Sequence, residues 1–177
     1  MQLMALSGSL RRGSSNTALP IAAAALAPAG VSVEVFGGLG VLPHFNPDLE
    51  GVEPAAVREF HAAVRQADGL LISTPEYAHG LPGVLKNALD WLVGSVDFPG
   101  KPVAIFQASP WATHAPAQLR EVLQVMNARL IEAASITLPL QGRRLDAAAI
   151  QADPALAATV RAALAAFAHA IAGPRPR

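Results

Sequence analysis

The sequence contains no cysteine among its 177 residues. This absence excludes disulfide bonds, cysteine-ligated zinc, iron–sulfur clusters and thiol catalysis, and it fits a reducing cytoplasm. A surplus of charge of one sign is also missing, because thirteen Lys and Arg residues balance thirteen Asp and Glu residues. Without a basic surplus the chain lacks the electrostatic footprint that binding to nucleic-acid backbones requires, so we expect no nucleic-acid partner.

Long hydrophobic runs are absent as well. The short apolar run after Met1 and Gln2 has neither the charged region nor the cleavage site of a secretory signal. No segment approaches the roughly 18 apolar residues that a spanning helix needs. We therefore expect a cytoplasmic protein without membrane contact, and the low charge leaves little repulsion against self-association.

The composition is that of a folded domain. Hydrophobic residues make up 52% of the chain and charged residues only 15%, so enough apolar surface can be buried to offset the entropy lost on folding. At 100 to 200 residues per domain, we expect residues 1–177 to form a single domain.

Strand and helix patterns alternate along the whole chain. This order predicts an α/β fold, in which helices cover both faces of a parallel sheet as a three-layer sandwich. Five strands in this alternation fit the flavodoxin-like order 2-1-3-4-5, whose ligand crevice lies between the first and third strands. The expected strands are 3–7, 31–36, 69–74, 102–108 and 135–138, and the expected helices are 16–29, 54–66, 81–93, 118–127 and 154–172.

The loop after the first strand reads GSLRRGSSN over residues 8–16 and precedes a helix. Backbone N–H groups and the helix dipole favour an anion there, Arg11 can pair with it, and three serine hydroxyls can donate to it: Ser9, Ser14 and Ser15. Ser14 replaces the lysine of a P-loop, and the spacing G-x-G-x-x-G is absent. The loop therefore favours a single phosphomonoester over a nucleoside triphosphate or a dinucleotide.

The loop after the third strand and its helix read PEYAHGLPGVLKNALDWL over residues 75–92. Together with GSLRRGSSN, this motif resembles the NADPH-dependent FMN reductase family, flavodoxin-like proteins that include quinone, chromate and azo-dye reductases. The resemblance spans roughly residues 1–130 and includes LPHFNPDLE at residues 42–50.

The resemblance implies where FMN would bind. It assigns the phosphate to Ser9, Arg11, Ser14 and Asn16. It assigns the flavin ring to Pro75, Glu76, Tyr77 and Ala78, with Ser109 at the ring edge.

The chain departs from the family at the flavin end of this site. Ala78 and Gly80 stand where the family often has Asn and Ser, so side-chain hydrogen bonds are lost there. Residues 111–114, Trp-Ala-Thr-His, replace a common Gly-Gly pair and are bulkier beside the open flavin face.

The helix at 81–93 carries two apolar stripes, and the second, with Val84, Ala88 and Trp91, is covered either by the chain itself or by another subunit. The family resemblance favours coverage of this stripe by another subunit, in a homodimer or homotetramer. The five histidines, His44, His61, His79, His114 and His169, have no metal-binding spacing, so we expect no metal site.

These observations predict an NAD(P)H-dependent oxidoreductase that binds FMN noncovalently and passes electrons to quinones or similar acceptors. No acid–base residue is needed for hydride transfer, so no catalytic side chain is named. Two alternatives stay open: a flavodoxin-type electron carrier, which the neutral charge disfavours, and a non-catalytic flavin-binding module.

Overall fold

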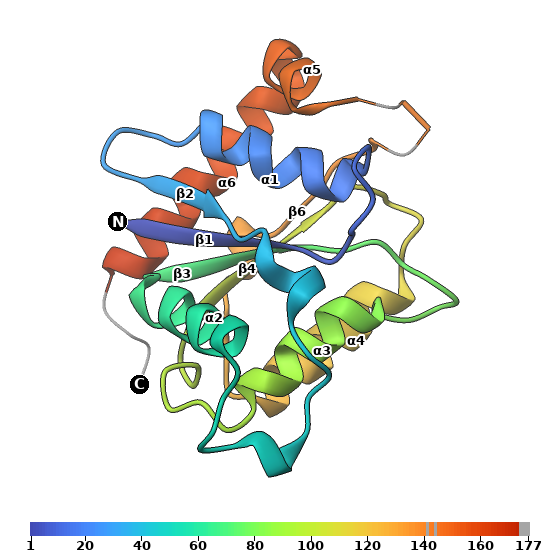
Figure 1. Cartoon of the computed structure of the whole chain (residues 1–177). Coiled ribbons are helices and arrows are strands. Elements are labelled where there is room, and N and C mark those ends of the chain that lie inside the picture. Colours follow the sequence, from blue (N-terminus) through green and yellow to red (C-terminus); the bar gives the residue numbers. More distant parts are fainter. Residues whose placement is uncertain (141, 144, 174–177) are drawn as a thin grey trace.

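The computed structural model describes residues 1–140, 142, 143 and 145–173. Its centre is a parallel sheet in the order β2-β1-β3-β4-β5, with β6 also paired to β4 (Figure 1). The predicted flavodoxin-like order 2-1-3-4-5 is therefore confirmed. The strands are β1 Gln2–Ser7, β2 Ser32–Val35, β3 Gly69–Ser73, β4 Pro102–Gln107, β5 Arg129–Leu130 and β6 Ile136–Thr137.

The edge of the sheet beside β4 is formed by two short strands rather than by the one strand expected at 135–138. β5 pairs with the start of β4 and β6 with its end, and one 3₁₀ turn, Glu132–Ala134, lies between them. At the interruption the Ser135 hydroxyl accepts the Ile105 N–H at 3.0 Å, in place of a ladder carbonyl. A two-residue strand is too short to show a hydrophobic period, which is why the pattern did not reveal β5.

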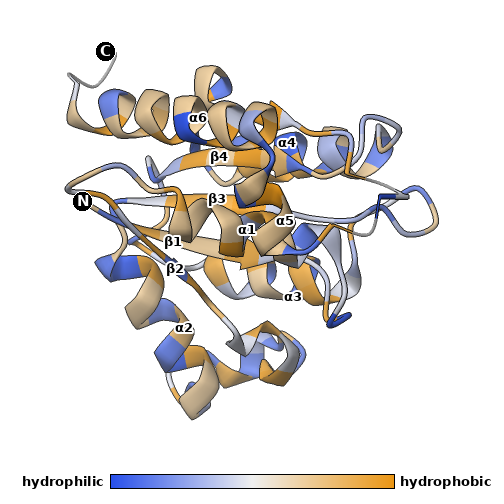
Figure 2. Ribbon diagram, turned by 90° about the horizontal axis from the view of Figure 1, so that it is seen from above, coloured by the Kyte–Doolittle hydropathy of each residue, from blue (hydrophilic) through white to orange (hydrophobic). Residues whose placement is uncertain are grey.

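Helices cover both faces of the sheet, as the three-layer prediction requires (Figure 1). The two sets of helices close two separate buried cores, one on each face, and Figure 2 shows apolar residues concentrated along the strands between them. One face carries α1 Ser15–Ala25, α5 Ala147–Ala152 and α6 Pro154–Ala172, and the other carries α2 Ala55–Gln66, α3 Gly83–Leu92 and α4 His114–Val125.

The bounds of two predicted helices need correction, and one helix was not predicted. α1 ends at Ala25 rather than near residue 29, because Pro28 disfavours a helical backbone at the residue before it, Ala27. α4 begins at His114, four residues earlier than expected, and α5 was not expected at all. The start of α6 matches the prediction, whereas Pro174, expected to end it, lies outside the described residues.

The Asp153 carboxylate caps α6 by accepting the N–H groups of Ala155 at 3.0 Å and Leu156 at 3.1 Å. These two bonds, that from Leu156 first, lower the pKa of Asp153 below its ordinary value of 3.8. The stabilising charge is present above that ordinary value and is lost as the pH falls through the lower folded pKa. We expect Asp153→Asn, which keeps an acceptor, to lower the melting temperature at neutral pH, with the difference shrinking below pH 3.8 in thermal unfolding. A difference that stays constant down to strongly acid pH would contradict this.

The last helix corrects the statement that no segment approaches a spanning length. α6 has 19 residues and a mean hydropathy of 1.6, and by length and composition it could cross a membrane. Its Leu156, Val160, Leu164 and Phe167 are nevertheless buried in the core between α6, α1 and the sheet. This packing is that of a core helix in a layered domain.

The second apolar stripe of α3 is covered by the chain itself. The Trp91 Nε1–H donates to the Pro43 carbonyl at 2.9 Å, and the Trp91 ring meets Phe45 edge to face at 5.1 Å. The Asn87 side chain also donates to Pro43 and accepts from the Phe45 N–H. The long loop at 37–53 thus folds over α3, so this stripe no longer argues for a subunit contact.

Candidate functional site

A cavity of about 560 Å³ lies at the carboxyl ends of β1, β3 and β4. This is the position where parallel α/β sheets bind ligands. It is lined by Ser9, Arg11, Gly13, Ser14, Ser15, Asn16, Thr74, Pro75, Glu76, Tyr77, Gln107, Ala108, Ser109, Trp111, Ala112 and Gly142. Every predicted site residue is among them except Ala78, which lies one residue beyond the wall.

One end of the cavity is a polar loop that is held in place by hydrogen bonds within it and beneath it. The Ser14 hydroxyl caps α1 by accepting the Asn16 N–H at 3.2 Å, and the Ser9 hydroxyl accepts the Arg11 N–H at 3.3 Å. Beneath the loop, the Ser7 and Thr17 hydroxyls are hydrogen-bonded at 2.8 Å. Ser9 and Ser14 are buried, so their hydroxyls are held in fixed positions beside the N-terminus of α1.

Two hydrogen bonds join this loop to Ser73, the last residue of β3, directly before the second loop. The Gly8 N–H donates to the Ser73 carbonyl at 2.8 Å, and the buried Ser73 hydroxyl donates to Asn16 Oδ1 at 3.1 Å. The second bond leaves the Asn16 amide NH₂ as a donor at the cavity wall. The two predicted motifs thus form one continuous site.

The two neighbouring arginines take different positions. Arg11 lines the cavity, whereas Arg12 lines a separate, smaller hollow between α1 and the start of α5. Both side chains are exposed. Of the two, Arg11 is therefore the one placed to pair with an anion in the cavity.

The other end of the cavity is aromatic and open. Tyr77 is 55% exposed and Trp111 is 80% exposed, and both line the cavity. Glu76 Oε2 accepts the N–H groups of His114 at 2.7 Å and Ala115 at 2.9 Å. These bonds, that from Ala115 first, lower the pKa of Glu76, so its carboxylate is ionised at neutral pH and caps α4.

A tight turn explains why Ala78 does not line the cavity. Tyr77 and Gly80 exchange two backbone hydrogen bonds, and the two residues between them have left-handed backbones, with φ of 49° at Ala78 and 58° at His79. Two positive φ values between paired residues are typical of a type I′ turn, which usually contains Asn or Gly. Ala and His adopt it only at a cost in conformational energy.

Replacing Ala78 by glycine should stabilise the protein. Glycine adopts positive φ without strain but loses more entropy on folding, so we expect the free energy of unfolding to rise by about 0.5 to 1 kcal/mol. Urea denaturation monitored by circular dichroism measures this. As the control, Ala165→Gly at an exposed position inside α6 should lower the free energy of unfolding by about 1 kcal/mol. Destabilisation by both substitutions would contradict a strained turn.

The sequence reasoning missed several wall residues: Thr74, Gln107, Ala108, Ala112 and Gly142. Thr74 and Gln107 end or directly follow buried strands, and this position was a usable signal. Gly142 had no such signal, because it comes from the segment after β6, where the resemblance is weak.

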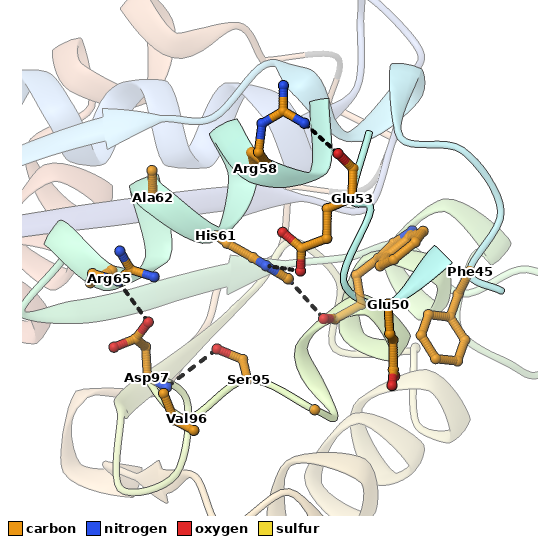
Figure 3. Close-up of a pocket in the computed structure, with 12 residues that line it drawn as sticks. Phe45, Glu50, Glu53, Arg58, His61, Ala62, Arg65, Ser95, Val96 and Asp97 are labelled. Atoms are coloured by element: carbon orange, nitrogen blue, oxygen red, sulfur yellow. Dashed lines mark hydrogen bonds and ion pairs between the residues drawn. The ribbon is translucent and has the colours of Figure 1, made fainter. Parts of the chain in front are cut away.

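A second cavity, of about 480 Å³, lies between α2 and the residues that follow α3 (Figure 3). Arg65 is paired with Asp97 at 2.8 Å and His61 with Glu53 at 3.1 Å, while Arg58 donates to the Glu53 backbone carbonyl and Glu50 adds a further carboxylate. None of the predicted site residues lines it. With three carboxylates against two arginines in its lining, this cavity is a poor site for a phosphate.

Comparison with known proteins identifies the family of the chain. The sequence profile of the NADPH-dependent FMN reductase family matches residues 1–142, which include both loops. The chain belongs to this family. Among curated relatives, the NAD(P)H-dependent FMN reductase PA1204 of Pseudomonas aeruginosa is 37% identical over 159 residues, covering 82% of this chain and 85% of that protein. A 2-hydroxy-1,4-benzoquinone reductase from Burkholderia is 38% identical over 153 residues, 83% of each chain.

Solved structures support the same family and fold. The flavoenzyme FerB of Paracoccus denitrificans, an NAD(P)H:(acceptor) oxidoreductase, superimposes with a TM-score of 0.77 at 26% identity, covering 94% of this chain and 97% of that one. An archaeal flavodoxin, 13% identical, has a TM-score of 0.58 over 96% of this chain and shows the shared fold.

The wall residues fit FMN. The polar end offers hydroxyl, amide and guanidinium donors beside a helix N-terminus, which suits a phosphate. The other end combines the apolar Pro75 and Ala108 with Tyr77 and Trp111, which suits a planar ring system. The volume also lies in the usual range for a cofactor pocket, about 300 to 1,000 Å³.

Proposed function

We propose that this protein is an NAD(P)H-dependent reductase that holds FMN in the 560 Å³ cavity and passes electrons to quinones. The observation that carries the proposal is one continuous cavity joining a phosphate-type loop to an aromatic end, in a chain of the FMN reductase family. The relatives named as FMN and quinone reductases support the same activity. Chromate, azo dyes and free flavin are further acceptors that an open site admits.

The polar loop would hold the phosphate without any metal. Ser9, Ser14 and Ser15 supply hydroxyl donors, Asn16 supplies an amide donor and Arg11 supplies positive charge. Because Ser9 and Ser14 are already fixed by hydrogen bonds to the loop backbone, little further ordering is needed when the phosphate binds.

The loop after β3 would fix the ring. Pro75 restricts the backbone, and Glu76 anchors the loop to the start of α4 through two hydrogen bonds. Tyr77 and Ser109 stand on opposite loops of the cavity, after β3 and β4. Held between these loops, the ring keeps one orientation toward the open mouth.

FMN, when bound, supplies the redox chemistry, since its ring accepts a hydride from a nicotinamide and returns two electrons to an acceptor. The side chains at the wall bind and orient, and none is required to move a proton for hydride transfer. The exposed Trp111 lines the cavity that nicotinamide and acceptor would enter in turn, and its flat ring offers a stacking surface for either.

We also propose that the protein works in the cytoplasm as a homodimer or homotetramer. The absence of cysteine and the use of nicotinamide cofactors support the compartment. The exposed aromatic side chains that line the cavity, Tyr77 and Trp111, support contact between copies. Light scattering after gel filtration tests the assembly, and a monomer at micromolar concentration would overturn it.

The visible absorption spectrum of the purified protein tests the proposed activity. FMN is added, unbound flavin is removed, and NADPH and then NADH are added anaerobically. Retained flavin absorbance that bleaches with either nicotinamide supports the reductase. Retained flavin that neither one bleaches would instead indicate an electron carrier or a non-catalytic module, and no retained flavin would overturn the FMN site.

A further inference from the structure

Two histidines and a glutamate meet just outside the cavity wall. The rings of His79 and His114 are stacked, with centroids 4.3 Å apart and planes 12° from parallel. One ligand atom from each of Glu76, His79 and His114 lies within 4.8 Å of the other two. Both histidines are exposed and Glu76 is half-buried, so the cluster opens to solvent.

The cluster is assembled from two loops that are fastened to each other. Glu76 and His79 lie on the loop after β3, and His114 is the first residue of α4. Glu76 Oε2 accepts the His114 and Ala115 N–H groups, and the Leu81 N–H donates to Gln118 Oε1 at 2.7 Å. The backbone positions of all three side chains are therefore fixed, while the exposed imidazole rings can still rotate.

The backbone of the turn between Tyr77 and Gly80 is a second, independent observation that points to a functional site. His79 has a φ of 58°, a left-handed backbone that histidine seldom adopts, and Ala78 beside it has a φ of 49°. Strained backbone of this kind concentrates at functional sites. In this turn the strained conformation accompanies the stacking of the His79 ring on His114.

The donor set is that of a transition-metal site. Two imidazole nitrogens and one carboxylate oxygen suit Zn²⁺, and also Co²⁺, Ni²⁺ or Cu²⁺, whereas Mg²⁺ and Ca²⁺ prefer oxygen alone. Metal bonds of about 2.0 to 2.2 Å in a tetrahedral site place ligand atoms about 3.3 Å apart. Each imidazole lone pair lies in its ring plane, so the exposed rings must turn out of their stack for ligand atoms that are already within 4.8 Å to reach that spacing around one ion.

We propose that Glu76, His79 and His114 form a binding site for a divalent transition metal, Zn²⁺ in the first instance. Three protein ligands leave the fourth position of a tetrahedral ion open, as in catalytic rather than structural zinc sites. Because Glu76 also lines the cavity, the ion lies at the cavity's edge. Its open position is available to water or to a small oxygen donor there.

This site has no sequence signature. His79 and His114 are 35 residues apart and lie on different elements, so no H-x-x-H or H-E-x-x-H spacing exists to reveal it. The prediction of no metal site rested on the absence of such spacing. The fold nevertheless brings His79 and His114 together.

Cobalt titration of tag-free, chelator-treated protein tests the proposal. Co²⁺ bound to histidine and carboxylate ligands absorbs visible light, and Zn²⁺ added afterwards should displace it and abolish the signal. We expect one Co²⁺ per chain, and at least about tenfold weaker binding for His79→Ala and for His114→Ala. Isothermal calorimetry with Zn²⁺ gives the same comparison without an optical signal, both with FMN and without it, so the result does not depend on the proposed flavin function.

The control is His169→Ala, which removes an exposed histidine on α6 outside the cluster and should leave Co²⁺ affinity unchanged. Circular dichroism checks that each variant is folded. No Co²⁺ or Zn²⁺ binding at millimolar metal would overturn the proposal and leave the pair as an aromatic stack. Equal weakening by all three alanine variants, or by none of them, would also overturn it.

Discussion

Replacing Arg11 by alanine should weaken FMN binding by about 10- to 150-fold. A hydrogen bond to a charged group contributes about 1.5 to 3 kcal/mol, and Arg11 is the cation that lines the phosphate end of the cavity. The serine and asparagine donors around it are neutral, so none can replace the lost charge. Fluorescence titration of the FMN-free protein measures the dissociation constant, because flavin emission changes when the ring is bound.

The adjacent Arg12 provides a matched control. It has the same charge and is exposed like Arg11, but it lines the hollow between α1 and α5 instead of the cavity. Arg12→Ala should therefore change FMN affinity by less than about threefold, the size of a screened surface charge. Arg11→Lys, which keeps the charge but loses bidentate geometry, should fall between the two alanine variants. If both alanine variants lost affinity equally, a general field effect would replace the direct phosphate contact.

The architecture was predictable because its signals are local and repeated. Buried strands such as β3 and β4 appear as short apolar runs, and the Asp153-Pro154 pair marks the start of α6. The features that were missed depend on tertiary contacts. β5 is too short to carry a period, and the cover over Trp91 comes from Pro43 and Phe45, about 48 residues earlier in the chain.

The candidate site divides in the same way. The polar end of the cavity could be predicted because all its donors lie within residues 8–16, next to one helix start. The wall opposite is shared between three loops, so Gly142 had no local signal. The histidine cluster is the extreme case, because its ligands become neighbours only when the loop after β3 packs on α4. Sequence reading finds sites made by one segment and misses those made by several.

Replacing Gly8 by alanine should damage both the fold and the FMN site. A Cβ atom at Gly8 would lie 2.4 Å from Thr74 Oγ1 and 2.9 Å from Thr74 Cβ, closer than real contacts allow. Thr74 is buried and β-branched, and its hydroxyl donates to the Pro75 carbonyl, so it cannot rotate away freely. Overpacking of this kind costs about 1 to 3 kcal/mol of stability, measurable by urea denaturation.

The same substitution should also weaken FMN binding at least about tenfold, because the Gly8 N–H to Ser73 bond holds the first loop against the end of β3, where the second loop of the cavity begins. Gly13→Ala is the matched control, since a Cβ there meets nothing within 4 Å although Gly13 lines the same cavity. Adding Thr74→Ala to Gly8→Ala removes the oxygen at 2.4 Å and should restore part of both losses. If Gly13→Ala proved as harmful as Gly8→Ala, lost loop flexibility would be the cause. If only Gly8→Ala is harmful and Thr74→Ala rescues it, the FMN site depends on the close approach of the chain after β1 to the chain after β3.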